Sequence, residues 1–234
     1  MSFSKLGLAT EIVRAVTEFG YTEPTAIQEQ AIPAILAGGD ILAGAQTGSG
    51  KTAAFTLPIL HMLADKSVKG QSEGRPPIRA LILVPTRELA AQVEECIIDY
   101  GKHLKLTSMV MIGGVSINPQ IKALRSRVDI LVATPGRLLD HISQGTLSLS
   151  QVQTLILDEA DRMLDMGFIR DIKKILALLP KKRQTLLFSA TFSPEIKTLA
   201  AQFLNDPVLI QASAPNTTVA LITHKVHPVT TDQK

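Results

Sequence analysis

Residues 45–52 read AQTGSGKT and lie between an apolar run, DILAGA, and a stretch of helical character, AAFTLPIL. A glycine-rich turn between a strand and a helix surrounds phosphate oxygens with backbone N–H groups, and the helix dipole adds to the attraction. The pattern predicts a nucleotide-phosphate site with Lys51 at the β- and γ-phosphates and the Thr52 hydroxyl on Mg²⁺. The other predicted loop residues are Gln46, Thr47, Gly48, Ser49 and Gly50.

This loop departs from the usual phosphate-loop pattern at one position, because its first residue is Ala45 where that pattern has glycine. The glycine is not required for the later Gly-Ser-Gly-Lys-Thr turn, so the departure carries little weight. The alternative is an ordinary glycine turn followed by a chance Lys-Thr. The strand before the turn and the helix after it favour the phosphate site.

A second candidate site is the segment TLILDEAD at residues 154–161, an apolar strand that ends in adjacent carboxylates. In phosphate-loop enzymes a carboxylate at such a strand end completes the Mg²⁺ site, and a neighbouring one activates water. We therefore expect Asp158 to hold the metal and Glu159 to act as the base. The alternative is plain loop chemistry in which Asp161 caps the next helix. Together with the phosphate loop, the pair indicates an ATP and Mg²⁺ site.

Composition limits the other functional classes. No apolar run approaches the roughly 20 residues needed to cross a membrane, the start of the chain does not read as a secretory signal, and the single cysteine, Cys96, excludes an internal disulfide. We expect a cytoplasmic protein. The net charge of +3 permits a nucleic-acid partner without requiring one. With no Trp, seven Phe and two Tyr, a base-stacking surface is not expected, so a nucleic acid would be held by its backbone. The histidines show no metal-ligand spacing.

Short apolar runs alternate with amphipathic stretches along the chain, which predicts strands joined by helical crossovers. The result would be an α/β domain with a mostly parallel central sheet and helices on both faces. A helix is expected over residues 87–104, with Cys96 packed as a core thiol beside its apolar stripe. The predicted strands are residues 40–45, 80–84, 108–112, 130–133, 154–157, 185–188 and 208–210.

Three features fall outside this alternation. The polar segment at residues 65–77 predicts a surface loop, and residues 213–234 are expected to be a linker. Pro33 and Pro58 lie inside helical patterns, where we expect kinks or helix breaks.

The order of motifs resembles the DEAD-box family of ATP-dependent RNA helicases. The chain carries AQTGSGKT, PTRELAAQ (85–92), GG (113–114), TPGR (134–137), DEAD (158–161) and SAT (189–191) in the order of that family. Phe3 and GYTEPTAIQ (20–28) match its adenine-recognition element. The resemblance implies a RecA-like domain over residues 1–212, with the adenine-recognition region at 3–31, and it is strongest to compact bacterial members.

The same resemblance implies that the Gln28 amide reads the adenine base, with Phe3 and Tyr21 packing nearby. An amide can meet the N7 acceptor and the N6 donor of adenine together. A rival interpretation comes from the residues themselves, since Thr25 and Gln28 have the spacing of a capping box at a helix start. The two interpretations are compatible.

For the nucleic acid, the resemblance implies RNA-backbone contacts by Arg87, Gly114, Thr134 and Arg137. The alternative for the arginines is an ordinary solvated position. Thr86 and Thr134 also look like helix N-caps, and Pro135 suits a first helical position. Capped helix N-termini present N–H groups to phosphates, so these interpretations agree with RNA binding.

Ser189 and Thr191 end an apolar strand, QTLLFSAT. The resemblance implies that they couple the nucleotide state to RNA handling by bonding to the acidic motif. The alternative is a pair of strand-end hydroxyl groups with no special role.

The family carries further motifs, including an arginine finger, in a second RecA-like domain, and nothing after Thr191 resembles them. We expect this chain to be one motor domain of a larger protein and to turn over ATP slowly by itself, because an arginine finger contributes on the order of 10³–10⁵ in rate. Competing hypotheses are an ATP-gated RNA clamp or assembly platform, and a motor acting on DNA or protein.

Overall fold

The computed structural model describes residues 2–46, 48–65 and 77–211, and within them the chain forms a seven-stranded sheet. All six strand pairings are parallel, in the order β3-β4-β2-β5-β6-β1-β7. The predicted parallel sheet is confirmed, and strand ends differ from the prediction by at most one residue. The strands are β1 (Ile41–Gly44), β2 (Ala80–Leu83), β3 (Ser108–Met111), β4 (Ile130–Ala133), β5 (Thr154–Leu157), β6 (Gln184–Ser189) and β7 (Val208–Gln211).

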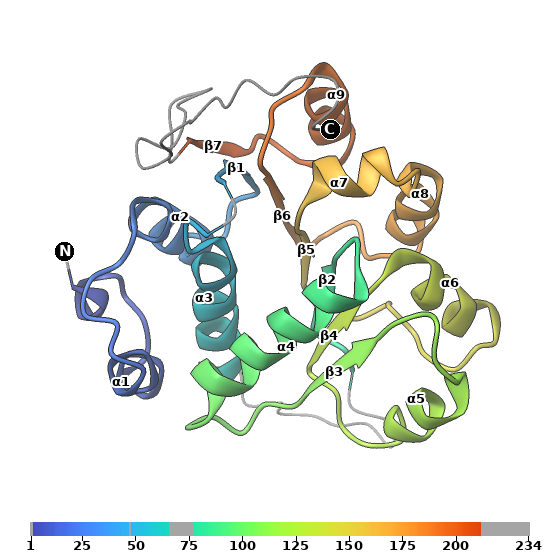
Figure 1. Ribbon diagram of the computed structural model, residues 1–234, viewed down its shortest axis with the longest axis horizontal. Coiled ribbons are helices and arrows are strands. Elements are labelled where there is room, and N and C mark those ends of the chain that lie inside the picture. The colour runs from blue at the N-terminus through green and yellow to red at the C-terminus, as the bar shows by residue number, and fades with distance from the viewer. Residues whose placement is uncertain (1, 47, 66–76, 212–234) are drawn as a thin grey trace, which may run out of the picture.

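Helices cover both faces of the sheet (Figure 1). One face carries η1 (Phe3–Lys5), α1 (Thr10–Glu18), α2 (Ala26–Leu36), α3 (Lys51–Asp65) and α4 (Arg87–Gly101). The other carries α6 (Pro135–Ser143), α7 (Ala160–Asp165), α8 (Ile169–Ala177) and α9 (Pro194–Phe203), and α5 (Ile117–Ala123) follows β3. No helix among the described residues has the length and apolarity required to cross a membrane.

Two hydrophobic cores follow from the alternation of side chains along each strand. Ile82 of β2 packs with α1 to α4, whereas its neighbours Leu81 and Leu83 pack with α6 to α9. Successive side chains of a strand point to opposite faces, so a strand covered on both faces must be apolar throughout. This requirement explains why β2, β4 and β5 are buried at every position.

The helix containing Pro33 and the helix containing Pro58 both continue through the proline. Of the kinks or helix breaks expected at these two residues, the breaks are therefore ruled out. A proline inside a helix removes one hydrogen bond and crowds the preceding turn. Here α2 and α3 bury apolar residues on each side of the proline, including Ile32, Ile35 and Leu57, and that packing outweighs the local cost.

Helix α4 begins as expected and ends three residues early, at Gly101 instead of Leu104. The Thr86 hydroxyl accepts a hydrogen bond from the backbone N–H of Leu89 at 3.2 Å, which confirms the predicted N-cap. The predicted linker at residues 213–234 and most of the predicted loop at 65–77 lie outside the described residues.

Asp40 joins three segments at the amino end of the sheet. Its carboxylate accepts hydrogen bonds from the backbone N–H groups of Thr185 and Asn205, both at 2.7 Å. Its carbonyl oxygen accepts from the N–H of Val208 at 2.9 Å, so one residue aligns the starts of β1, β6 and β7. Asp40 is 9% exposed as a residue, and the two N–H groups lose their partner if its carboxylate is removed.

Replacing Asp40 by alanine is expected to lower the free energy of unfolding by about 3 kcal/mol, because two backbone donors are left unpaired in a poorly hydrated position. Chemical denaturation followed by circular dichroism measures the change. Asp165→Ala is the control, since Asp165 is exposed at the end of α7 and its loss should cost less than about 0.5 kcal/mol. Equal stability of the two variants would contradict the role given to Asp40.

Candidate functional site

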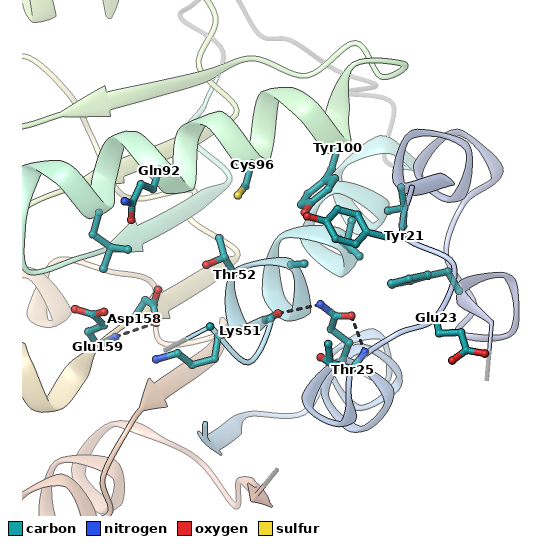
Figure 2. A pocket seen from close by; sticks show the side chains of 18 residues that line it. Tyr21, Glu23, Thr25, Lys51, Thr52, Gln92, Cys96, Tyr100, Asp158 and Glu159 are labelled. Atoms are coloured by element: carbon teal, nitrogen blue, oxygen red, sulfur yellow. Dashed lines mark hydrogen bonds between the residues drawn. The ribbon is translucent and has the colours of Figure 1, made fainter. Parts of the chain in front are cut away.

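A cavity of about 450 Å³ opens at the carboxyl edge of the sheet, where the loops after β1 and β5 meet the segments around α1 and α2 (Figure 2). In open α/β sheets this edge is where ligands bind. Most of the residues predicted for nucleotide and metal line the cavity: Phe3, Tyr21, Gln28, Gly48, Gly50, Lys51, Thr52, Asp158 and Glu159.

The predicted phosphate loop is a tight turn between β1 and α3. The hydroxyl of Ser49 donates to the carbonyl oxygen of Gln46 at 2.7 Å. Neither Gln46 nor Ser49 lines the cavity, so both shape the loop, and Thr47 lies outside the described residues. Gly48 and Gly50 have φ angles of 83° and 90°, the left-handed region that favours glycine.

The glycine at position 50 is required for a second reason, which is space. A Cβ atom there would lie 2.5 Å from the amide nitrogen of Gln28 and 2.9 Å from the hydroxyl oxygen of Thr25. The Gln28 amide nitrogen donates a hydrogen bond to the Gly50 carbonyl oxygen at 3.1 Å. The phosphate loop and the start of α2 are therefore in direct contact through this glycine.

The ammonium group of Lys51 is the most informative feature of the cavity. The residue is 7% exposed, and its Nζ atom is buried with no hydrogen-bond partner within the described part of the chain. A buried, unpaired ammonium is costly because it has lost its hydration shell. It lines the cavity together with Asp158 (Figure 2), so the arrangement is suited to an anionic ligand that supplies the missing partners.

Asp158 is 2% exposed at the end of β5. Burial raises the pKa of its carboxyl group, the Lys51 ammonium lowers it, and the neighbouring Glu159 raises it, so that the pKa of Asp158 is about 6. A carboxylate held in this environment gains from any cation that binds beside it. The Thr52 hydroxyl lines the same cavity.

Glu159 has a left-handed backbone conformation, with φ of 52° and ψ of 50°. Its N–H donates to the Asp158 carboxylate at 2.9 Å, and its own carboxylate pairs with Arg162 at 3.2 Å. Non-glycine residues in this region are strained, and such strain is concentrated at functional sites. Glu159 is also the N-cap position of α7, because that helix starts at Ala160. The alternative in which Asp161 caps the helix is therefore wrong.

Asp161 instead joins the acidic loop to the loop after β6. Its Oδ2 atom accepts hydrogen bonds from the N–H groups of Ala190 and Thr191, both at 3.1 Å, and from the Thr191 hydroxyl at 3.3 Å. The Ser189 hydroxyl donates to the Thr191 carbonyl oxygen at 2.7 Å. The expected bond between this segment and the acidic motif is present, and Asp161 makes it.

Gln28 forms the capping box that the sequence predicted as one of two interpretations. Its amide oxygen accepts from the N–H of Thr25 at 3.0 Å, and its amide nitrogen donates to Gly50. An amide group has two donors and two acceptor lone pairs. One donor and one lone pair therefore remain for a ligand, and capping does not exclude contact with a base.

The cavity wall opposite the phosphate loop is a stripe of α4 that the sequence analysis did not assign. Gln92, Cys96 and Tyr100 are spaced by four residues and point into the cavity (Figure 2). Cys96 is half-buried at this wall and is not the packed core thiol that we expected. Burial raises the pKa of its thiol, as do Asp99 and Glu95. The spacing was visible in the sequence, but it did not reveal which face of α4 borders the cavity.

The residues predicted to contact RNA gather at the ends of β2, β4 and β3, which are neighbours in the sheet. Gly114 has a φ of 73°, and a Cβ atom there would overlap the Arg87 guanidinium group. Arg137 donates from Nη2 to the Val115 carbonyl oxygen at 2.8 Å, while its Nη1 is buried without a partner in the described chain. The two arginines therefore flank the loop after β3.

Thr134 precedes α6, and Pro135 occupies the first turn as predicted, but the Thr134 side chain makes no capping hydrogen bond. Thr134 nonetheless occupies the N-cap position of α6, so the predicted N-cap is confirmed in position and only the side-chain bond is missing. Thr134 still has extended backbone geometry, and its N–H donates to the carbonyl oxygen of Met111 in β3 at 3.1 Å. Thr134 therefore links β4 to α6, because its carbonyl oxygen also accepts a hydrogen bond from the N–H of Leu138 at 3.2 Å.

Comparison with known proteins agrees with this geometry. The chain is 47% identical over 222 residues to the ATP-dependent RNA helicase CshA of Limosilactobacillus reuteri, covering 95% of this chain and 43% of the relative. It is 47% identical over 215 residues to the ATP-dependent RNA helicase DeaD of Escherichia coli K12, covering 91% and 33%. The chain thus spans less than half the length of these curated relatives.

A solved structure of a DEAD box protein from Methanococcus jannaschii matches with a TM-score of 0.81 and 43% identity, covering 91% of this chain and 56% of that one. The family model for the DEAD/DEAH box helicase matches residues 25–199. That range includes the phosphate loop, the acidic motif and the arginine-flanked loop described above. The chain belongs to the DEAD/DEAH box helicase family.

Proposed function

We propose that this chain is the first motor domain of an ATP-dependent RNA helicase, which binds ATP with Mg²⁺ and holds RNA by its backbone. The observation that carries the proposal is the buried Lys51 ammonium, which lacks a hydrogen-bond partner in the described chain and lines a cavity with the glycine loop. A polyphosphate supplies the anionic oxygens that this group needs. The names of the relatives, ATP-dependent RNA helicases, support the same conclusion.

The residues present suit Mg²⁺. This ion is usually held by one or two carboxylates together with substrate phosphates and water, and does not need a cage of protein ligands. Asp158 and the Thr52 hydroxyl supply oxygen ligands at one cavity. When bound, the ion would neutralise charge that develops on the phosphates.

The remaining cavity residues divide between the two ends of the nucleotide. Glu159 borders the phosphate end and is the base that would accept a proton from the attacking water. Gln28 keeps one donor and one lone pair for the adenine edge, and Phe3 and Tyr21 offer aromatic surface beside it.

The RNA side of the proposal rests on the loop after β3, which has the Arg87 side chain on one side and the Arg137 side chain on the other. Guanidinium groups bind phosphates in a forked geometry, and the N-termini of α4 and α6 add backbone N–H groups. Thr134 lies at the start of α6, and Gly114 gives the Arg87 side chain room to lie across the loop. Backbone contacts of this kind carry little base specificity.

The hydrogen bonds of Asp161 with Thr191 support a coupling role for the segment that contains Ser189. A change in the acidic loop on hydrolysis would pass directly to the loop after β6. Completion of the reaction and of the RNA groove is assigned to a second RecA-like domain, in line with the greater length of the relatives. We also assign the protein to the cytoplasm, where a chain with one cysteine needs no disulfide.

Substitution Lys51→Ala tests the nucleotide site. ADP binding in the presence of Mg²⁺, measured by isothermal titration calorimetry, is expected to weaken by at least about 100-fold, because the buried cation for the phosphates is gone. Thermal stability should not fall, since the variant removes an unpaired buried charge. Lys173→Ala, at an exposed position of α8, is the control. Unchanged ADP affinity in Lys51→Ala would remove Lys51 from the phosphate site.

Substitution Glu159→Gln tests the assignment of the base. In a motor that carries both RecA-like domains, the variant should bind ATP with nearly the wild-type affinity yet lose RNA-stimulated hydrolysis by about 100-fold or more. The amide keeps the size of the side chain and removes its ability to accept a proton. Phosphate release gives the rate and nucleotide binding gives the affinity. Surviving turnover would mean that another residue is the base.

Substitution Gly114→Ala tests the RNA surface. The variant is expected to bind single-stranded RNA about tenfold more weakly, because the added Cβ both strains a left-handed residue and displaces the Arg87 guanidinium. Fluorescence anisotropy at low salt measures the affinity. The matched control is Gly113→Ala, where a Cβ meets no atom within 4 Å. ADP binding should be the same in both variants, and equal RNA affinity of the two would reject this surface.

A further inference from the structure

Cys96 is the single cysteine of the chain, and its side chain forms part of the wall of the cavity of about 450 Å³. It lies on α4, one helical turn after Gln92 and one turn before Tyr100, which line the same wall. Figure 2 shows the sulfur atom on the side of the helix that faces the cavity. Because the residue is only half-buried, a small molecule that enters the cavity can contact the thiol.

The lining of the cavity combines charged groups with apolar side chains. Lys51 and Asp158 supply charges, whereas Val16 of α1 and Leu57 of α3 supply apolar surface. The helices that carry Val16, Leu57 and Cys96 pack against one another. Ligand cavities are commonly lined in this way, with apolar walls and a few polar groups that fix orientation. An uncharged small molecule therefore finds apolar surface in the cavity that the thiol borders.

An independent observation shows that this cavity is suited to a ligand. The Lys51 residue is 7% exposed, and its Nζ atom is buried without a hydrogen-bond partner in the described chain. A buried ammonium without partners is costly, and an anionic ligand that enters the cavity supplies them. Cys96 thus borders a space that a ligand would occupy, which distinguishes it from a cysteine packed in the core.

The surroundings of the thiol decide which reagents suit it. The thiolate is the reactive form of cysteine. Burial raises the pKa of the Cys96 thiol, and the carboxylates of Asp99 and Glu95 raise it as well. The thiol is therefore mostly protonated at neutral pH and reacts more slowly than an exposed one. The same carboxylates repel an anion beside the thiol, so a small uncharged reagent is favoured.

We propose that Cys96 is a modification site whose thiol adds to small, uncharged electrophiles of the maleimide type, and that the adduct and the nucleotide exclude each other. In this addition the thiolate sulfur forms a bond to one carbon of the electrophile's double bond. The other carbon takes up the proton that the thiol released, and no group leaves. The exclusion rests on the proposed ATP function, whereas the addition does not. Cys96 has no part in holding the nucleotide.

The rate of labelling by N-ethylmaleimide tests the site in the folded chain. Mass spectrometry of the wild type should show one adduct, because there is one cysteine. ADP with Mg²⁺, at about 20 times its dissociation constant, should slow labelling about 20-fold, since only the free cavity reacts. In Lys51→Ala the adduct should form at close to the wild-type rate, and the same ADP concentration should no longer protect.

A matched control moves the thiol to the outer side of the same helix. The double variant Cys96→Ser/Ile98→Cys places it at a position that is 58% exposed and does not line the cavity. This thiol should react faster than Cys96, and ADP should leave its rate unchanged. Equal protection of both positions would overturn the proposal, because it would show a general tightening of the fold.

The reverse experiment measures ADP binding to the purified adduct. Isothermal titration calorimetry should show an affinity at least about 100-fold weaker than that of the untreated chain, because the added group fills space in a closely packed cavity. Circular dichroism should show an unchanged fold. Cys96→Ser treated with the same reagent is the control, and its ADP affinity should equal that of the untreated wild type. An adduct that binds ADP with full affinity would contradict the exclusion.

The remaining outcomes separate this proposal from the nucleotide function. If the untreated wild type does not bind ADP, the nucleotide function is wrong and the exclusion falls with it. If it binds ADP and labelling continues at the same rate, the exclusion alone is wrong. If the urea-unfolded chain forms the adduct and the folded chain does not, Cys96 is not a modification site.

Discussion

The parallel direction of every strand is the constraint on which the rest of the structure depends. In such a sheet each connection has to cross back over a face, so all the strands present their carboxyl ends at one edge. The strand order β3-β4-β2-β5-β6-β1-β7 then sets which loops are neighbours along that edge. The loops after β1, β5 and β6 carry the phosphate turn and the acidic motif, and the loops after β2, β4 and β3 carry the arginine-flanked surface. The two proposed binding surfaces thus lie along the same edge of the sheet.

Electrostatics at the first surface favours a ligand. The Lys51 ammonium and the Asp158 carboxylate lie in the same buried setting, where charges are poorly solvated. Burial raises the pKa of Asp158, and Lys51 only partly offsets it. A polyphosphate and a divalent cation bound in this cavity would therefore supply the opposite charges that both groups lack. The strained Glu159 backbone adds to this picture, because its conformation aims a second carboxylate into the same space.

Short polar contacts connect the loops at this edge. Gln28 bonds to Gly50, and so links the start of α2 to the phosphate turn. Asp161 bonds to Thr191, and links the acidic loop to the loop after β6. From the sequence alone, both Gln28 and Asp161 could be assigned to a helix cap. In the folded chain Gln28 serves both purposes, whereas Asp161 contacts the neighbouring loop and leaves the N-cap position to Glu159. Hydrogen bonds therefore link the loops at this edge, an arrangement that suits the proposed coupling.

Local sequence patterns are enough to predict the α/β class, the approximate strand limits and the phosphate turn, because these features depend on the spacing of apolar residues and on glycine geometry. The sequence also identified Asp158 and Glu159, whose position at a strand end follows from the order of residues alone. Three other features become visible in the folded chain: Cys96 and Tyr100 face the cavity, the Thr134 side chain makes no capping bond to α6, and helices continue through Pro33 and Pro58. These outcomes depend on which face of a helix meets which neighbour. Packing energies between distant segments, spread over many residues, outweigh the local preferences of single residues.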